Sequence, residues 1–105
     1  MKRAWVYILE CADRSYYTGL TTAIEKRIAE HELGIHDGYT AARRPVKLIW
    51  TAEFPSVYQA ILVERQIKGW TRKKKEALVQ GNFEMLKELS SSTKTKLRKK
   101  GLRPS

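Results

Sequence analysis

The sequence predicts an α+β domain: a small three-stranded antiparallel sheet packed with helices, in the order β-β-α-β-α-α, over residues 1–82. A chain of 105 residues has room for one hydrophobic core. Its hydrophobic content of 42% and charged content of 30% are those of a soluble globular domain. A short turn separates the first two strand patterns, which favours a hairpin over a βαβ crossover.

The first two strands open the chain. The segment Ala4–Glu10 (AWVYILE) is β-branched, aromatic and apolar on both faces, which predicts a buried central strand. Asp13 indicates a turn, because its side chain readily bonds nearby backbone groups. The segment Ser15–Gly19 (SYYTG) then predicts the second strand, with Gly19 at its end.

The first helix and the loop after it follow. Thr22 and Glu25 have the spacing of a capping box, which predicts a helix over about Ala23–Leu33. Gly34 suits the position just past its end. Residues 34–45 hold two glycines and one proline, and we expect a loop there.

The third strand and two more helices complete the domain. The segment Val46–Phe54 (VKLIWTAEF) predicts a strand that Pro55 ends, and Ser56–Gln59 (SVYQ) is a second capping box for a helix ending near Gly69. The residues beyond it are assigned as follows: Thr71 caps a helix over Arg72–Val79, residues 83–89 are compatible with one or two helical turns, and residues 90–105 form a disordered basic tail.

The positive charge is concentrated in the last part of the chain. The net charge is +10, yet residues 1–64 carry eight Lys or Arg against eight Asp or Glu. Residues 65–105 carry thirteen Lys or Arg against three Asp or Glu. This asymmetry favours a polyanionic partner, either nucleic acid or an anionic membrane surface, with a merely solvated basic tail as the alternative. The interleaved aromatic residues favour nucleic acid.

The compartment follows from what the sequence lacks. No apolar run approaches the roughly 20 residues that a membrane-spanning helix needs. The apolar run near the N-terminus is short and Glu10 follows it, which argues against a signal peptide. The lone Cys11 excludes an intramolecular disulfide and a cysteine-based zinc site. We therefore expect a cytoplasmic protein without membrane association.

Four side chains from the first half of the chain are candidates for chemistry. Tyr7 and Tyr17 lie on the strands of the predicted hairpin, where a cross-strand aromatic pair is the structural alternative. Arg27 and His31 are four residues apart on the first helix and share a face. Their alternative is an ordinary solvent-facing surface.

Charged residues of the later helices form the second set of candidates. Glu64 either pairs with Lys68, four residues on, or provides a hard oxygen ligand for Mg²⁺. The run Arg72–Lys75 (RKKK) begins a helix, where positive charge opposes the helix dipole. A bound phosphate would satisfy both the free backbone N–H groups and the cations, which favours phosphate contact over a solvated face.

The order of these residues resembles the GIY-YIG nuclease superfamily over roughly residues 3–80. The run Trp5–Tyr7 and, ten residues from tyrosine to tyrosine, the run Tyr17–Gly19 are similar to its two short motifs. Arg27 follows the second tyrosine by ten residues and His31 by fourteen, both at positions that carry function in that family. Glu64 resembles its metal-binding glutamate. Residues 64–78 also resemble small stand-alone GIY-YIG proteins of bacteria, whose role is often unassigned.

Three positions depart from the family pattern. Trp5 stands where the first motif has its glycine, and Thr18 is the middle residue of the second motif. Leu20 occupies the place of a lysine that some nuclease members carry. The late asparagine of some members has no evident counterpart.

The resemblance implies an endonuclease that hydrolyses DNA phosphodiester bonds with one Mg²⁺ ion. Tyr17 would be the general base, directly or through a tyrosine–water relay, and Tyr7 would orient the water or share the proton. Arg27 would neutralise charge on the phosphoryl oxygens. His31 would hydrogen-bond a tyrosine or accept the proton.

The resemblance and the charge pattern also assign roles outside the proton transfer. Glu64 would hold the metal ion. Gly19 has no side chain and would permit a close approach to the backbone at the end of the second strand. Lys68 and Arg72, Lys73, Lys74 and Lys75 would contact nucleic acid, DNA in preference to RNA. One rival is a module of the same fold that binds nucleic acid without cutting it, and another is a basic ribosome- or membrane-associated protein without any site.

Overall fold

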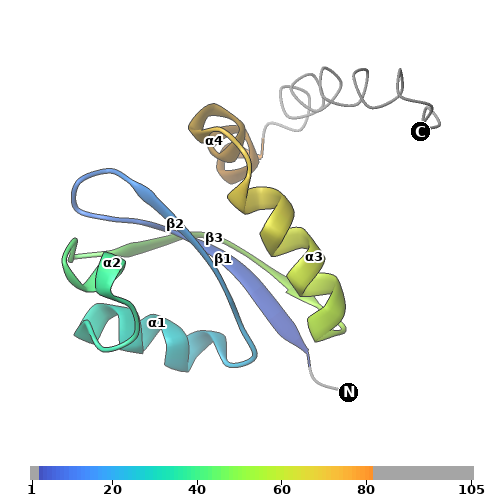
Figure 1. Ribbon diagram of the computed structural model, residues 1–105, viewed down its shortest axis with the longest axis horizontal. Helices are drawn as coiled ribbons and strands as arrows, with labels where there is room; N and C mark the ends of the chain where they lie inside the picture. Colours follow the sequence, from blue (N-terminus) through green and yellow to red (C-terminus); the bar gives the residue numbers. More distant parts are fainter. Residues whose placement is uncertain (1–2, 82–105) are drawn as a thin grey trace. The chain divides into compact units, whose positions relative to one another are not determined.

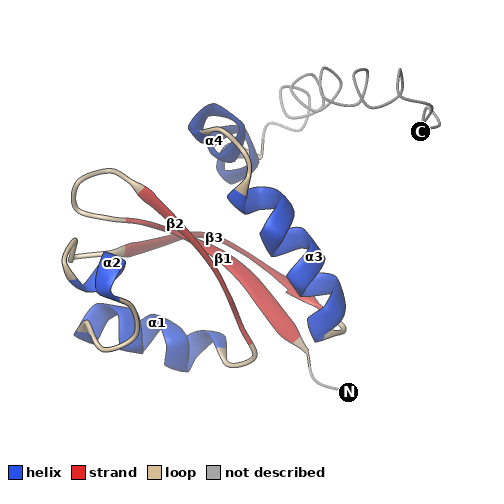
Figure 2. Cartoon of the chain, viewed as in Figure 1, coloured by secondary structure: helices blue, strands red, loops and turns tan. Residues whose placement is uncertain are grey.

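The computed structural model describes residues 3–81, and it confirms the α+β class and the antiparallel three-stranded sheet (Figures 1 and 2). In chain order the elements are β1 (Ala4–Glu10), β2 (Tyr16–Thr21), α1 (Ile24–Leu33), α2 (Gly38–Ala41), β3 (Lys47–Phe54), α3 (Val57–Lys68) and α4 (Arg72–Gln80). The helical turns expected at 83–89 and the disordered tail expected at 90–105 lie outside the described residues.

The chain forms two compact units. The first, Met1–Gly69, contains the sheet together with α1, α2 and α3, and the second begins at Trp70 and contains α4. The candidate catalytic residues and Glu64 lie in the first unit, whereas the RKKK run lies in the second.

Strand β1 is the centre of the sheet and of the core. It pairs antiparallel with β2 on one side and β3 on the other. Its Val6 and Ile8 are fully buried on one face, and Tyr7 and Leu9 are fully buried on the other. Helix α3 packs against all three strands. Burial on both faces explains why β1 has no polar alternation in its sequence.

Gly19 lies directly under a tyrosine ring. The strand register pairs Tyr7 with Gly19. A Cβ atom built on Gly19 would lie 2.5 Å from Tyr7 Cζ, well inside van der Waals contact. The missing side chain therefore makes the space in which the Tyr7 ring crosses β2.

Gly19→Ala is expected to destabilise the protein by about 1–3 kcal/mol, because the added methyl group must displace a fully buried ring. Chemical denaturation measures the loss. Gly38→Ala is the matched control, since a Cβ atom there meets nothing within 4 Å and its stability should hardly change. Equal stability of the two variants would contradict the close packing of Tyr7 on Gly19.

The start of α1 differs from the expected capping box. The N-cap residue is Ala23, which makes no side-chain cap, and Thr21 Oγ1 instead accepts a hydrogen bond of 3.0 Å from Ala23 N. The reason is that β2 continues to Thr21, two residues further than expected, so Thr22 lies outside the helix. The predicted end is confirmed, because Gly34 has the left-handed φ of +76°.

The caps of α3 and α4 are as predicted. Ser56 Oγ accepts a hydrogen bond from Gln59 N at 3.2 Å, and Thr71 Oγ1 accepts one from Lys74 N at 3.2 Å. With 12 residues α3 is the longest helix among residues 3–81, and none of those helices has the length and apolarity to cross a membrane.

The segment expected to be only a loop contains the short helix α2. Asp37 is its N-cap, and Asp37 Oδ1 accepts a hydrogen bond from Tyr39 N at 2.7 Å. A helix of four residues has no hydrophobic period that a sequence pattern could reveal. This correction matters because α2 supplies neighbours to the candidate site.

Candidate functional site

Three of the predicted catalytic side chains form a cluster of rings. The ring centroids of Tyr7 and Tyr17 are 6.4 Å apart, and His31 lies 5.6 Å from Tyr7 and 5.2 Å from Tyr17. The strand register places both tyrosines on the same face of the hairpin, as diagonal neighbours. His31 reaches them from the last turn of α1.

His31 is completely buried, and both of its ring nitrogens are paired. Its Nε2 is 2.7 Å from Tyr7 Oη, and its Nδ1 is 2.8 Å from Thr40 Oγ1. Tyr7 and Thr40 are also fully buried. These hydrogen bonds offset the cost of burying a polar ring and fix its orientation.

The surroundings of His31 keep its ring neutral. Burial lowers the pKa of His31 to about 4, and the charges of His36 and Arg27 act in the same direction. The His36 ring packs edge-on against His31, with 4.7 Å between centroids. At neutral pH His31 is therefore uncharged and able to accept a proton.

The stability of the protein is expected to fall as pH drops from about 6.5 to about 4. In this window the unfolded chain binds a proton at His31 that the folded protein does not, so acidification favours unfolding by roughly 3 kcal/mol in total. Denaturant titrations at several pH values measure the slope. His31→Gln should flatten the slope and the exposed-histidine control His36→Gln should keep most of it, whereas an unchanged slope in His31→Gln would contradict the buried neutral state.

Tyr17 has a different partner from Tyr7. Its hydroxyl donates to Asp37 Oδ2 at 3.2 Å. Burial raises the pKa of Tyr17, and the neighbouring Tyr7 and Asp37 raise it further. The pKa of Asp37 is lowered, because hydrogen bonds from Tyr39 N and the Tyr17 hydroxyl outweigh the effect of burial. Tyr17 thus keeps its proton while Asp37 carries a negative charge.

An aromatic and cationic stack supports Tyr17 from α2 and the segment after it. The rings of Tyr39 and Tyr17 are stacked, with 6.2 Å between centroids and 27° between planes. Arg43 Cζ lies 3.8 Å from the centre of the Tyr39 ring, and Arg43 Nε bonds Asp13 Oδ2 at 3.1 Å. The β1–β2 turn and the α2 segment therefore hold each other beside Tyr17.

Charged groups from two helices act on the Tyr7 hydroxyl. Burial raises the pKa of Tyr7, Arg27 opposes this by its hydrogen bond and its charge, and the charges of Asp37 and Glu64 raise the pKa again. Arg27 therefore lies beside the ring cluster, and Glu64 of α3 lies within electrostatic reach of it. Tyr7, Tyr17 and His31 thus form one cluster, and the charges of Arg27 and Glu64 act on the Tyr7 hydroxyl within it.

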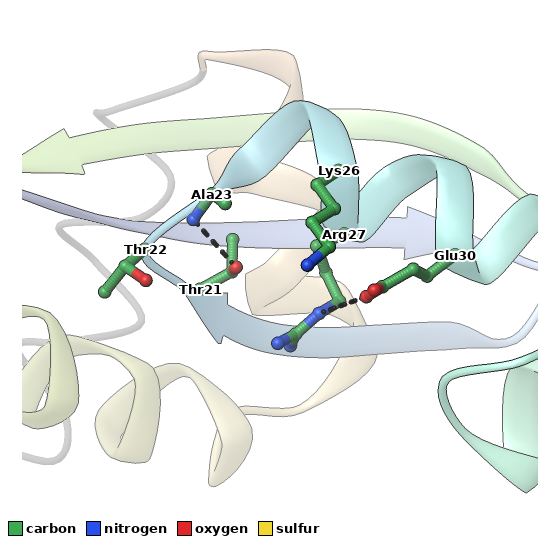
Figure 3. Close-up of a pocket in the computed structure, with 6 residues that line it drawn as sticks. All are labelled: Thr21, Thr22, Ala23, Lys26, Arg27 and Glu30. Atoms are coloured by element: carbon green, nitrogen blue, oxygen red, sulfur yellow. Dashed lines mark hydrogen bonds and ion pairs between the residues drawn. The ribbon is translucent and has the colours of Figure 1, made fainter.

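Arg27 borders a surface pocket of about 160 Å³. Figure 3 shows its lining from the end of β2 and the first turns of α1: Thr21, Thr22, Ala23, Lys26, Arg27 and Glu30. Arg27 Nε bonds Glu30 Oε1 at 3.2 Å, and Nη1 donates to the Leu20 carbonyl oxygen at 3.3 Å. These bonds leave other N–H groups of the guanidinium available, so Arg27 is able to bind an anion from this pocket.

Glu64 is a mostly buried carboxylate with a cationic neighbour. Its side chain is 16% exposed, and Oε2 lies 2.9 Å from Lys68 Nζ. Among residues 3–81, no group of three or more His, Cys, Asp or Glu is arranged to hold a metal ion. A lone carboxylate still suits Mg²⁺, which takes one or two carboxylates and fills its other positions with water and substrate phosphate. Glu64 fits this chemistry once Lys68 releases it.

The RKKK run forms the first turn of α4 in the second unit, without any acidic residue in that turn. Arg72 Nε bonds Glu76 Oε2 at 3.0 Å, and Lys74 Nζ lies 4.5 Å from the centre of the Trp70 ring. Burial lowers the pKa of Lys74. Lys73 is exposed.

The sequence did not point to the polar residues that α2 contributes. Asp37, Tyr39 and Thr40 all contact the ring cluster, yet they lie in the segment expected to be a loop. One signal was present, because Asp37 precedes Gly38 in the manner of an N-cap residue before a helix. Their contact with Tyr17 and His31 depends on how the chain folds back after α1.

Comparisons with known proteins show what this chain is similar to. The family model described as "GIY-YIG catalytic domain" matches residues 3–77. A UPF0213 protein of Natronomonas pharaonis is 48% identical over 75 residues, which cover 71% of this chain and 88% of the relative.

Two solution structures determined by NMR are similar to this fold. The EF2693 protein of E. faecalis aligns with a TM-score of 0.56 and 39% identity, over 79% of this chain and 88% of its own. The UPF0213 protein BH0048 of Bacillus halodurans aligns with a TM-score of 0.51 and 45% identity, over 74% of this chain and 83% of its own.

Proposed function

Since the chain belongs to the GIY-YIG catalytic domain family, we propose that it is an endonuclease that hydrolyses DNA phosphodiester bonds with the help of Mg²⁺. The observation that carries the proposal is the cluster in which His31 contacts both tyrosine rings, hydrogen-bonds the hydroxyl of Tyr7 and has Arg27 nearby. This cluster places a proton acceptor, His31, near a cation, Arg27, that can bind phosphate.

The Tyr7–His31 pair is the proton acceptor in this proposal. Tyr7 is fully buried in the free protein, so this step requires that substrate binding admit a water molecule to its hydroxyl. That water transfers its proton to Tyr7 Oη while the hydroxyl proton of Tyr7 passes to His31 Nε2. The water oxygen bonds to phosphorus and the bond to the leaving oxygen breaks. Tyr17 orients the water, because Asp37 holds its hydroxyl proton and leaves its oxygen free to accept a hydrogen bond. The family resemblance had implied the reverse assignment, with Tyr17 as the base.

Arg27 links phosphate binding to this proton transfer. Its guanidinium can bind the phosphoryl oxygens and neutralise the negative charge that develops on them. The same charge holds the pKa of His31 low in the free protein. A bound phosphate cancels that charge, so His31 becomes a stronger base when substrate is present.

Glu64 is the residue that would hold Mg²⁺. When bound, the ion polarises the phosphate and stabilises the leaving oxygen. In the free protein Lys68 neutralises the mostly buried Glu64 carboxylate. Released by Glu64, Lys68 becomes available for the DNA backbone. The basic residues Arg72–Lys75 of the second unit are separate candidates for contact with phosphate.

A module that binds nucleic acid without cutting it is the second candidate. The Glu64–Lys68 ion pair favours it, because the carboxylate already has a partner. The departures from the family motifs at Trp5, Thr18 and Leu20 point in the same direction.

A cleavage assay beside a binding assay separates the two functions. The purified protein is incubated with duplex, single-stranded and branched DNA, in Mg²⁺ or in EDTA, and binding is followed by fluorescence anisotropy. The nuclease proposal expects Mg²⁺-dependent products from at least one substrate. Binding without products from any of them would favour the binding module.

A further inference from the structure

Thr40 is fully buried against His31 and makes two hydrogen bonds with one hydroxyl group. Its Oγ1 is 2.8 Å from His31 Nδ1 and donates at 3.2 Å to the backbone oxygen of Asp37. A hydroxyl has one proton to donate. If that proton goes to the Asp37 carbonyl, which can only accept, Thr40 Oγ1 must accept from a protonated Nδ1 of His31.

The hydrogen bond at Nε2 of His31 also places the ring proton on Nδ1. The Tyr7 hydroxyl is fully buried and needs an acceptor for its proton. Its neighbour Arg27 can only donate, whereas His31 Nε2 is 2.7 Å away. Nε2 is therefore unprotonated and accepts from Tyr7, so the proton of the neutral ring belongs on Nδ1.

We propose that Thr40 is a positioning residue that holds His31 in the tautomer protonated at Nδ1 and thereby keeps Nε2 open to the proton of Tyr7. In the opposite tautomer, an Nε2 proton would point at Tyr7 Oη and block this path. The consequence for catalysis rests on the proposed nuclease function, but the tautomer itself is a property of the free protein.

The fold of α2 explains how Thr40 reaches this position. Asp37 caps the helix through Tyr39 N, and its backbone oxygen accepts from both Ala41 N and the Thr40 hydroxyl. Asp37 also holds Tyr17 through its other carboxylate oxygen. One turn of chain thus sets the hydrogen-bonding partners of both tyrosines, directly for Tyr17 and through His31 for Tyr7.

The test is ¹⁵N NMR of the His31 ring nitrogens in the wild-type protein, Thr40→Val and Thr40→Ser, at neutral pH. In the wild type, Nδ1 should be protonated and Nε2 unprotonated. Thr40→Val keeps the shape of the side chain but removes the acceptor for the Nδ1 proton, so the tautomer should shift towards Nε2–H. Thr40→Ser restores a hydroxyl and should restore the Nδ1–H tautomer.

Cleavage rates supply the second readout. In a Ser-His-Asp triad, replacing the Asp that holds the histidine tautomer lowers kcat by about 10⁴-fold. Because Thr40 is a neutral partner, we expect a smaller effect, in which Thr40→Val lowers the cleavage rate by roughly 10–100-fold. Thr40→Ser should recover most of that loss. If Thr40→Val changes the tautomer while neither it nor the wild type cleaves the DNA that it binds, the role of Thr40 is upheld and the nuclease function is refuted.

Two results would overturn the inference. A wild-type His31 protonated at Nε2 would show that Thr40 donates to the ring instead of accepting from it. An unchanged tautomer in folded Thr40→Val would show that another group controls the ring. The wild-type spectrum decides the first question even if Thr40→Val does not fold.

Discussion

Glu64→Gln is expected to reduce Mg²⁺-dependent cleavage by roughly 10²–10³-fold, because a catalytic metal ion contributes several kcal/mol of charge stabilisation. Glutamine keeps the length of the side chain but lacks the negative charge that attracts the ion. DNA binding should be retained or slightly stronger, since one repelling charge is lost and Lys68 is freed. Single-turnover cleavage and anisotropy measure the two effects separately.

Glu32→Gln is the control for the change in charge, because Glu32 lies exposed on α1 and its substitution leaves the ring cluster intact. It should cleave at the wild-type rate. If Glu64 serves only as half of an ion pair with Lys68, Glu64→Gln should cost no more than about 1 kcal/mol of stability and leave cleavage unchanged. Wild-type cleavage by folded Glu64→Gln would therefore remove the metal role.

Tyr7→Phe is expected to reduce cleavage by ~10²–10⁴-fold, the usual contribution of a positioned acid or base. The ring that packs on Gly19 remains, so the fold should be retained. Stability should fall by about 1–3 kcal/mol, because a buried His31 Nε2 loses its hydrogen-bond partner. Tyr58→Phe is the control, since Tyr58 is 70% exposed on α3.

Comparison with Tyr17→Phe identifies which tyrosine accepts the proton. We expect Tyr17→Phe to lose less activity than Tyr7→Phe, because Tyr17 donates to Asp37 and only orients the water. Tyr7→Phe and His31→Gln should be strongly non-additive when combined, as they interrupt one proton path. A larger loss in Tyr17→Phe would return the base role to Tyr17, and a wild-type rate in Tyr7→Phe would refute the proposed relay.

Elements with strong local signals were predictable from the sequence. The apolar run Ala4–Glu10 matched β1 to the residue, and Ser56, Thr71 and Gly34 marked helix ends through local hydrogen bonding or backbone conformation. The spacing of the candidate residues on strands and helix pointed to one region, and Tyr7, Tyr17 and His31 do lie together.

Features that depend on tertiary contact were not predictable. Thr22 had the local pattern of a cap, but pairing of β2 with β1 extends the strand to Thr21 and moves the helix start. Asp37 and Thr40 become site residues only because α2 folds back over His31 and Tyr17. Tyr7 hydrogen-bonds His31 and Tyr17 hydrogen-bonds Asp37, and this difference distinguishes their roles. The spacing of the motifs could not predict it.

Single-turnover cleavage of DNA in ¹⁸O-labelled water with Mg²⁺, followed by mass spectrometry of the products, tests the central claim most directly. Water activated by the Tyr7–His31 pair should place one ¹⁸O atom in each newly formed terminal phosphate. DNA that stays intact at every Mg²⁺ concentration, or a product phosphate without the label, would contradict hydrolysis by this site.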